Sequence, residues 1–320
     1  QNINTLTEMD ANVLESMNPD FNNKNESVMS RVEVGHSLGA IYGFRHKGIY
    51  AYDYDHNGYF SNEDKNKYTD AQGNPNTAAA ALQNPKPGLT IENATPVARD
   101  AQGNVIYDKA GNPVRMMFNY GGTNYAFDGG DVCYEDINHD GQINELDICY
   151  LGTSNPKVNG GFGIDLTYGR WTLKTNFNFR IGNKILNMAK MYAEDMRTNV
   201  NQMASVAWRW RKNGDITDIP RAKNAEAGES YNALISDRYV EPGDFLRFQY
   251  FQLGYSVDPK KLKKIRLSNL RISASGNNIF CFSKYSGVDP EHSQSGYGPC
   301  VDNSTTPRSK SFTFSLNFGF

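Results

Sequence analysis

The last ten residues of the chain alternate between large apolar and small polar side chains. The segment 311–320 reads SFTFSLNFGF, and every second residue from Phe312 to Phe320 is large and apolar. Successive side chains of a strand point to opposite faces, so one face would be wholly apolar and the other small and polar. This pattern, with its terminal aromatic residue, is typical of a membrane β-barrel, whose outward face meets lipid. A strand of a soluble sandwich also alternates, so the other segments have to discriminate between the two.

A second alternating segment covers residues 160–180 and contains its own turn. Gly169-Arg170 separates its two arms and predicts a tight hairpin. Tyr168 and Trp171 flank that turn, where an aromatic girdle would lie if the turn faced the periplasm. The alternating set of the two arms is Phe162, Ile164, Leu166, Tyr168, Trp171, Leu173, Thr175, Phe177 and Phe179.

Three further segments indicate strands. Residues 245–255 alternate with a change of phase near Tyr250-Phe251, which predicts a β-bulge. Residues 269–277 alternate again, and residues 37–52, rich in glycine and tyrosine, predict irregular β structure. Counted back from Phe320, short turns alternate with long loops, as outer-membrane barrels require.

The remaining segments are polar and lack a sustained period. Residues 1–30 predict the end of one strand and an exposed loop, and residues 52–118 predict a loop region with several turns. Residues 184–236 form a long polar excursion, a kind of segment that usually carries function or disorder. Candidates for substrate contact, for which a structural role is the commoner alternative, are Trp208, Trp210 and Tyr285.

Composition narrows the class of protein. The chain has 320 residues and a net charge of -2, which provides no field suited to nucleic acid. A mean hydropathy of -0.63 and the lack of a long apolar run exclude a transmembrane helix but not a barrel, whose strands are weakly polar on average. Aromatic residues at 12% and 29 glycines suit a protein of strands and turns.

The chain starts at Gln1 without a signal segment, so we expect a processed product or a piece of something longer. Its four cysteines fall into two pairs of short separation, Cys133 with Cys149 and Cys281 with Cys300. In an oxidising compartment these pairs predict two disulfide bridges, and four free thiols are the alternative.

Residues 136–147, DINHDGQINELD, match the twelve-residue calcium loop. A hard divalent cation takes about six to eight oxygen ligands, and this spacing wraps them around a bend at Gly141. Asp147 stands where a longer glutamate is usual, so we expect modest affinity. The predicted ligands are Asp136, Asn138, Asp140, the Gln142 carbonyl, Asn144 and Asp147.

A second match lies at residues 53–64, DYDHNGYFSNED, with Gly58 at the bend. For both loops the alternative is an Asp/Asn/Gly turn that needs no ion. Neither loop has the apolar helices on both sides that a calcium sensor needs, so calcium would stiffen an external loop. The predicted ligands here are Asp53, Asp55, Asn57, the Tyr59 carbonyl, Ser61 and Asp64.

The sequence contains no catalytic constellation. Its five histidines are scattered, two of them inside the calcium-loop matches, and no serine or cysteine nucleophile motif accompanies them. Glycine-rich stretches lack the strand-then-helix context of a phosphate-binding loop. We therefore expect a protein that is not an enzyme.

Longer signatures, in one order from about residue 35 to the end, resemble the C-terminal part of the SusC/RagA-type TonB-dependent outer-membrane transporters. Together they are far more specific than any single motif. The signatures are GHSLGAIYGFRHKGIY (35–50), YEDINHDGQINELD (134–147), LGTSNPKVNGGFG (151–163), DIPR (218–221), SDRYVEPGDFLRFQYFQLGYSV (236–257), LRISASGNNIFCFSKYSGVDPE (270–291) and the terminal strand.

The resemblance implies an all-β fold, namely the C-terminal strands of an antiparallel transmembrane β-barrel of about 22 strands with a plugged lumen and long extracellular loops. It implies uptake of oligosaccharides or peptides handed over by a SusD-like surface lipoprotein, with energy from the TonB complex. Transporter and lipoprotein would form a dimer of pairs in outer-membrane lipid. Residues 1–320 lack the family's plug domain and N-terminal strands, so we expect this segment to act with the remainder of the barrel. Substrate-binding residues do not carry over, because ligand contacts in the family vary with the loops.

The alternative is a secreted, calcium-stabilised all-β adhesin or glycan-binding module. The apolar side chains of the strands discriminate between the two. In the adhesin, Leu166, Phe177, Phe314 and Phe318 would lie in a dry interior, whereas in the transporter they would face hydrocarbon.

Overall fold

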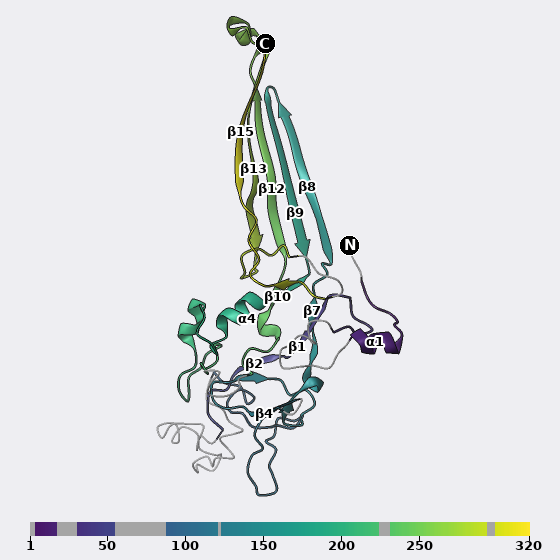
Figure 1. Cartoon of the computed structure of the whole chain (residues 1–320), viewed down its shortest axis with the longest axis vertical. Coiled ribbons are helices and arrows are strands. Elements are labelled where there is room, and N and C mark those ends of the chain that lie inside the picture. The colour runs from purple at the N-terminus through teal and green to yellow at the C-terminus, as the bar shows by residue number, and fades with distance from the viewer. Residues whose placement is uncertain (1–3, 18–30, 55–87, 121–122, 224–230, 293–297) are drawn as a thin grey trace.

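Five long strands form one antiparallel sheet that extends from a body of shorter elements (Figure 1). This computed structural model describes residues 4–17, 31–54, 88–120, 123–223, 231–292 and 298–320. The strand order of the long sheet is β15-β13-β12-β9-β8. Its strands are β8 (Val158–Tyr168), β9 (Trp171–Ile181), β12 (Phe245–Ser256), β13 (Asn269–Ser283) and β15 (Ser311–Gly319).

These strands confirm the predictions from alternation. Gly169 turns the β8–β9 hairpin with a φ of 59°, a conformation that glycine adopts without steric cost. The predicted bulge in β12 lies between Phe248 and Tyr250. Strand β13 is longer than expected, because the left-handed Asn278 (φ 52°) interrupts the alternation only locally and the strand continues to Ser283.

Within the described residues, the body consists of four small sheets, whose strand orders are β1-β7, β2-β5, β4-β3-β6 and β11-β10-β14. The two strands within residues 37–52 confirm the irregular β structure expected there. The strands of the body are β1 (Ala40–Gly43), β2 (His46–Ile49), β3 (Met117–Tyr120), β4 (Thr123–Ala126), β5 (Val132–Tyr134), β6 (Gln142–Ile143), β7 (Cys149–Thr153), β10 (Lys184–Asn187), β11 (Val240–Pro242) and β14 (Val301–Asp302).

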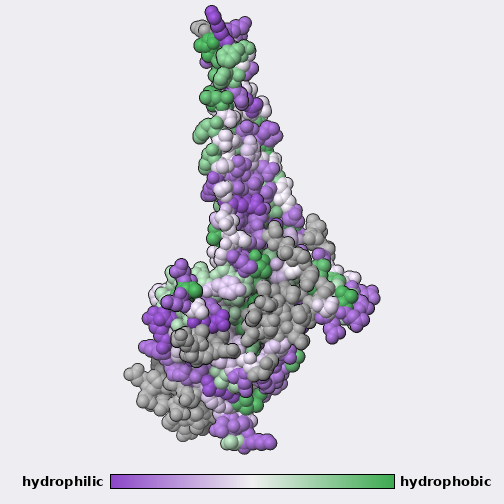
Figure 2. Space-filling view, viewed as in Figure 1, coloured by the Kyte–Doolittle hydropathy of each residue, from purple (hydrophilic) through white to green (hydrophobic). Residues whose placement is uncertain are grey.

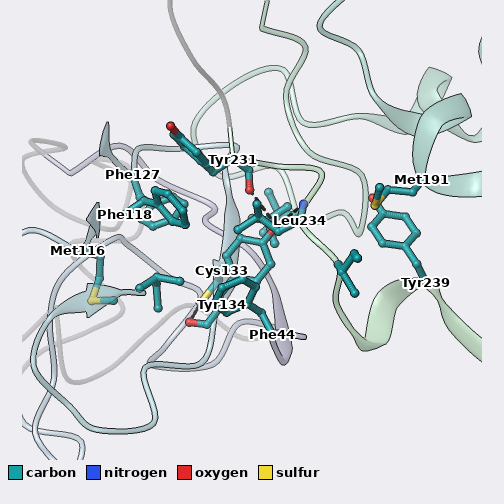
Figure 3. Close-up of a cluster of buried hydrophobic side chains, with 14 of the residues drawn as sticks. Phe44, Met116, Phe118, Phe127, Cys133, Tyr134, Met191, Tyr231, Leu234 and Tyr239 are labelled. Carbon is teal, nitrogen blue, oxygen red and sulfur yellow. Dashed lines mark hydrogen bonds between the residues drawn. The ribbon is translucent and has the colours of Figure 1, made fainter. Parts of the chain in front are cut away.

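Aromatic residues from these short strands form the core of the body (Figure 3). The ring of Phe118 stacks on that of Tyr231 at a centroid distance of 4.0 Å. Phe127 and Tyr134 pack beside them, and all four side chains are buried. This cluster holds together segments that are far apart in the sequence.

The helices in the described part of the chain are short. Within the described residues, no helix is long and apolar enough to span a membrane. The helices are α1 (Ala11–Met17), α4 (Met188–Glu194) and α5 (Pro259–Leu262), with the 3-10 helices η1 (Glu145–Asp147), η2 (Ala204–Trp208), η4 (Asp237–Tyr239) and η5 (Lys263–Ile265).

The described parts of two polar segments differ from what their sequences predicted. Residues 4–17 contain the helix α1 and no strand, because the Asp10 carboxylate accepts the Asn12 and Val13 N–H groups and caps a helix there. Residues 184–236 are not merely a polar excursion, because β10 and α4 begin that segment and Leu186 is fully buried in the core.

The expected bridge between Cys133 and Cys149 is also wrong, because both thiols are free. Cys133 lies on β5, which pairs with β2, and Cys149 lies on β7, which pairs with β1. The two cysteines therefore belong to different sheets. Burial raises the pKa of the Cys133 thiol to about 12, so it stays protonated and unreactive.

The second expected bridge, between Cys281 and Cys300, is wrong for a similar reason. Cys281 lies on β13 of the long sheet. Cys300 is buried against Ile185 and Tyr285, and its Sγ donates to the His292 carbonyl at 3.7 Å.

Candidate functional site

One face of the long sheet carries large apolar side chains that remain exposed. Phe314, Phe318 and Leu166, on the two edge strands, are 85%, 57% and 56% exposed. Phe177, on the inner strand β9, lies in the surface of the sheet between the rings of Phe162 (4.9 Å) and Phe248 (4.6 Å). A soluble monomer rarely exposes an apolar surface of this extent, and Figure 2 shows hydrophobic residues along the extended part of the molecule. None of the four discriminating residues lies in a dry interior.

The strand register aligns apolar and polar residues into rows that cross the sheet. Leu166 lies opposite Leu173, and the same row continues through the other strands to Phe314. The adjacent row points to the other face, where Lys174 forms an exposed ion pair with Asp165 at 3.5 Å. The apolar row is Leu166, Leu173, Leu253, Ala274 and Phe314, and the polar row is Asp165, Lys174, Gln252, Ser275 and Thr313. The sheet thus separates an apolar from a polar environment across its full width.

The dimensions of the sheet match a bilayer. The five strands have 9 to 15 residues, and a tilted strand needs about 9–11 residues to span the hydrocarbon core. Trp171 contacts the ring of Tyr255 at 4.7 Å beside the β8–β9 turn, where Tyr168 is also exposed. Aromatic residues gathered at one end of a sheet are typical of a membrane interface.

The two ends of the sheet differ in their connections. At one end, here called the turn end, residues 169–170 join β8 to β9 and residues 257–268 join β12 to β13. At the other, the loop end, β9 connects to β12 and β13 connects to β15 through long segments. Their described residues, 182–223, 231–244, 284–292 and 298–310, lie near or within the body (Figure 1). This arrangement of short turns and long loops is the one expected for an outer-membrane barrel.

The predicted calcium loop at residues 136–147 is an ordered part of the body. The bend at Gly141 has a φ of 81°, and a Cβ there would lie 2.9 Å from the Cβ of Ala98, so glycine is required. Strand β6 pairs with β3, and Ile143 is fully buried in the core. The loop is therefore anchored to the body by its apolar position.

Backbone N–H groups of the loop donate to its acidic side chains. Asp136 accepts from Gly141 N at 2.8 Å, and Asp140 accepts from Gln142 N at 2.8 Å. Asp147, which is fully buried, accepts from Asn144 N at 2.9 Å. Within the described residues, no three acidic, histidine or cysteine side chains are gathered closely enough to form a metal site. The carboxylate, amide and carbonyl donors still have the chemistry that a hard cation prefers.

Burial in this loop disfavours the charged form of two carboxylates, Asp147 and Asp136. Burial raises the pKa of Asp147 to about 6, and the negative charges of Asp136 and Asp140 also raise it. Burial likewise raises the pKa of Asp136. A divalent cation would relieve both effects.

Most of the second calcium-loop match lies outside the described residues, including Asp55, Asn57, Tyr59, Ser61 and Asp64. Of its predicted ligands, only Asp53 lies within the described residues. Its carboxylate accepts from Asn213 Nδ2 at 2.7 Å, and its N–H donates to Asn213 Oδ1 at 2.8 Å.

The three candidate substrate contacts have different environments. Trp210 Nε1 donates to the Ala51 carbonyl at 3.1 Å, and the indole packs on the core of the body. Tyr285 is buried and donates to Asp302 at 2.6 Å. These two side chains are structural, whereas Trp208 is 80% exposed.

A buried ion pair between Asp131 and Arg221, which the sequence did not predict, joins two distant segments of the body. Asp131 is fully buried, and its two oxygens accept from Arg221 at 2.8 Å each. Tyr125 donates to the same carboxylate at 2.6 Å. Arg221 belongs to the DIPR signature, but no local pattern links it to a partner 90 positions away.

Curated proteins similar to this chain are TonB-dependent receptors of Formosa agariphila. The chain is 28% identical to receptor P39 over 306 residues, which cover 90% of this chain and 26% of that protein. It is also 28% identical to receptor P3 over 200 residues, 60% of this chain and 19% of that protein. The chain thus spans about a quarter or less of the length of these relatives. No family model matches it.

Two solved structures share the fold. The RagAB peptide transporter superposes with a TM-score of 0.50 at 18% identity, covering 60% of this chain and 21% of that chain. The RagAB peptide importer in the closed-closed state superposes with a TM-score of 0.51 at 16% identity, covering 90% of this chain and 24% of that chain. The predicted resemblance and the predicted fold, a partial antiparallel transmembrane β-barrel, are confirmed.

Proposed function

We propose that this chain, which resembles the C-terminal part of a SusC/RagA-type TonB-dependent transporter, forms part of an outer-membrane barrel that imports oligosaccharides or peptides. The five-stranded sheet is the observation that carries the proposal. Its apolar rows are exposed on one face, and its polar rows lie on the other. In a barrel the apolar face contacts lipid and the polar face borders a water-filled passage.

The two edges of the sheet support the expectation of further strands. Strands β8 and β15 each pair with one neighbour in the described chain, which leaves a row of free backbone groups on each edge. A barrel satisfies both edges by closure, so the remainder of the barrel would pair with them.

Orientation and partners follow from the same proposal. The loop end and the body lie outside the cell, where a SusD-like lipoprotein delivers the solute. Energy comes from the TonB complex through the plug domain of the barrel, and two transporter–lipoprotein pairs form a dimer. Support for these partners comes from the resemblance.

Fractionation tests the membrane proposal. We expect recovery in the outer-membrane fraction, extraction only with detergent, and a folded form that migrates differently from the heated form in electrophoresis. The alternative adhesin would be recovered from the aqueous fraction, and that result would refute the transporter. Uptake of labelled peptides compared with labelled oligosaccharides then identifies the class of solute.

We further propose that residues 136–147 bind calcium, which would stiffen the body rather than take part in transport. Asp136, Asn138, Asp140, Asn144 and Asp147 would supply side-chain oxygens, with the Gln142 carbonyl. The raised pKa values of Asp147 and Asp136 support this proposal, because a cation would stabilise both carboxylates.

Calorimetry tests the calcium proposal. Asp136→Ala should remove one calcium-binding event from the parent protein. Asp108→Ala is a matched control, because Asp108 also accepts loop N–H groups from Ala110 and Asn112 but lies outside the motif. If the parent protein shows no heat of calcium binding, the calcium proposal is refuted. Asp55→Ala tests the match at residues 53–64 in the same way.

A further inference from the structure

We propose that the connection between β13 and β15 is a strap, fixed across the polar face of the long sheet by Arg247, and that it restricts the solutes that enter at the loop end. The strap comprises the described residues 284–292 and 298–310. This inference rests on the proposed function, because the polar face borders a passage only within a barrel.

Arg247 is the anchor of the strap on the sheet. It lies on β12, on the face opposite Phe248, and its side chain is only 5% exposed. Its guanidinium forms an ion pair with Asp289 at 2.5 Å and another with Glu291 at 3.0 Å. Both carboxylates belong to the strap, so one sheet residue holds two strap residues.

Two further arginines complete this contact. Arg180 of β9, on the same face as Arg247, donates to the His292 carbonyl at 2.9 Å. Arg308, near the end of the strap, pairs with Glu291 at 2.9 Å. The two carboxylates are therefore balanced by Arg247 and Arg308. Arg247, Asp289 and Glu291 are largely buried, and buried charges of this kind have to be paired.

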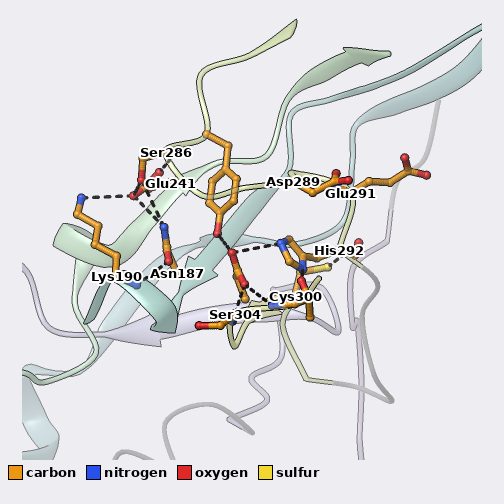
Figure 4. Close-up of polar contacts among 12 residues, drawn as sticks. Asn187, Lys190, Glu241, Ser286, Asp289, Glu291, His292, Cys300 and Ser304 are labelled. Atoms are coloured by element: carbon orange, nitrogen blue, oxygen red, sulfur yellow. Dashed lines mark hydrogen bonds and ion pairs between the residues drawn. The ribbon is translucent and has the colours of Figure 1, made fainter. Parts of the chain in front are cut away.

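The strap is also tied to the body (Figure 4). Strand β14 lies within it and pairs in parallel with β10. Cys300 N donates to Ser154 Oγ at 2.7 Å, and Ser286 Oγ donates to Glu241 at 2.7 Å. Inside the strap, Tyr285 donates to Asp302. Anchors on two sides make the strap a fixed part of the lining and not a free loop.

The two ends of the polar face show the effect of the strap. At the loop end Arg247 and Phe245 are buried. Towards the turn end, the side chains of Asp165 and Lys174 are 69% and 54% exposed. In the proposed barrel, the strap narrows the passage along the polar face at the loop end. The paired charges of Arg247 with Asp289 and Glu291 set the polarity of the passage wall there.

A native thiol reports on the strap. Cys281 lies opposite Arg247 in the strand register, on the same face of the sheet. The probe is a membrane-impermeant maleimide, applied to outer-membrane vesicles that carry the protein with Cys149 replaced by serine. Labelling of Cys281 is measured on its own peptide, separately from Cys300, which lies in the strap. Arg247→Gln should release the strap and raise the rate of Cys281 labelling by at least about tenfold, because the largely buried Asp289 then loses the cation that pairs with it.

Lys174→Gln is the control, because it removes an ion pair of the same face that does not touch the strap. Arg247→Gln/Asp289→Asn/Glu291→Gln is a second variant, in which the anchor is lost without unpaired buried charge, so it tests the proposal if the single variant fails to fold. We expect the triple variant also to label faster and to import longer solutes than the parent.

The outcomes separate the two proposals. Unchanged labelling of Cys281 in both anchor variants, with the protein in the membrane, would overturn the strap alone. Recovery of the parent protein from the aqueous fraction would overturn the proposed function and the strap with it.

Discussion

The long sheet and the body use the same aromatic residues in opposite environments. Phe314 of the sheet is 85% exposed, whereas Phe118 of the body is fully buried. In the body, short strands from several segments surround each ring. In the sheet, the apolar rows have no second layer among the described residues, and in the proposed barrel lipid covers them. The same side chain thus stabilises each region through a different surrounding medium.

Charged residues show the same contrast. In the body, Asp131 is fully buried and held by Arg221. On the polar face of the sheet, Asp165 and Lys174 stay exposed, as side chains do beside water. Polar groups are paired where water is excluded and hydrated where it is present.

Truncation of a core ring in the body should have the largest effect. Phe118→Ala leaves a cavity beside Tyr231, and we expect it to lower the free energy of unfolding by about 3–5 kcal/mol. Hydrogen exchange of the body amides measures this loss. Phe314→Ala is the matched truncation in the sheet and should cost much less, because lipid fills the space; equal losses would contradict the contrast between the two regions.

A charge on the lipid face should have the next largest effect. Phe314→Arg should lower the free energy of unfolding in lipid vesicles by about 2–4 kcal/mol, because a guanidinium is poorly solvated in hydrocarbon. Thr313→Arg, one position away on the polar face, should be nearly neutral. Equal costs for the two variants would show that the two faces do not meet different media.

Acid should destabilise the body through His46. Burial and the neighbouring Arg238 charge lower the pKa of this histidine to about 4 in the folded protein. Between about pH 6.5 and pH 4 the unfolded chain binds a proton that the folded body does not, so stability falls by up to about 1.4 kcal/mol per pH unit. His46→Gln should flatten this dependence in hydrogen exchange of β1 and β2, and an unchanged slope would exclude His46 as its source.

The smallest effect is expected for the exposed pair on the polar face. Lys174→Gln should change the free energy of folding by less than about 1 kcal/mol, because water screens the charges of Lys174 and Asp165. Urea titration in vesicles measures it. A larger loss would mean that this part of the polar face is drier than the proposed passage allows.

Local patterns predicted the sheet well. Alternation identified the hairpin around Gly169, the bulge near Tyr250 and the terminal strand, because strand faces follow directly from residue order. It underestimated β13, whose left-handed Asn278 breaks the pattern, and it missed α1, whose capping residue Asp10 lies in an otherwise featureless polar stretch.

Local sequence patterns could not predict contacts between residues that are far apart in the sequence. Short sequence separation suggested that Cys133 could reach Cys149, yet strand pairing places them in different sheets. The partners of Arg247 in the strap lie 42 and 44 positions away, at Asp289 and Glu291. The sequence around a carboxylate in a polar loop does not indicate which distant arginine will pair with it.

The amino-acid order alone determined which side chains share a strand face, where the chain turns at Gly169, and which oxygens a cation at residues 136–147 could use. These depend on backbone geometry over a few residues. Only the tertiary structure decided that the Phe314 row stays uncovered, that Asp131 meets Arg221, and that Arg247 holds the strap. Such contacts depend on how distant segments pack together, and that is set by the register and closure of whole sheets.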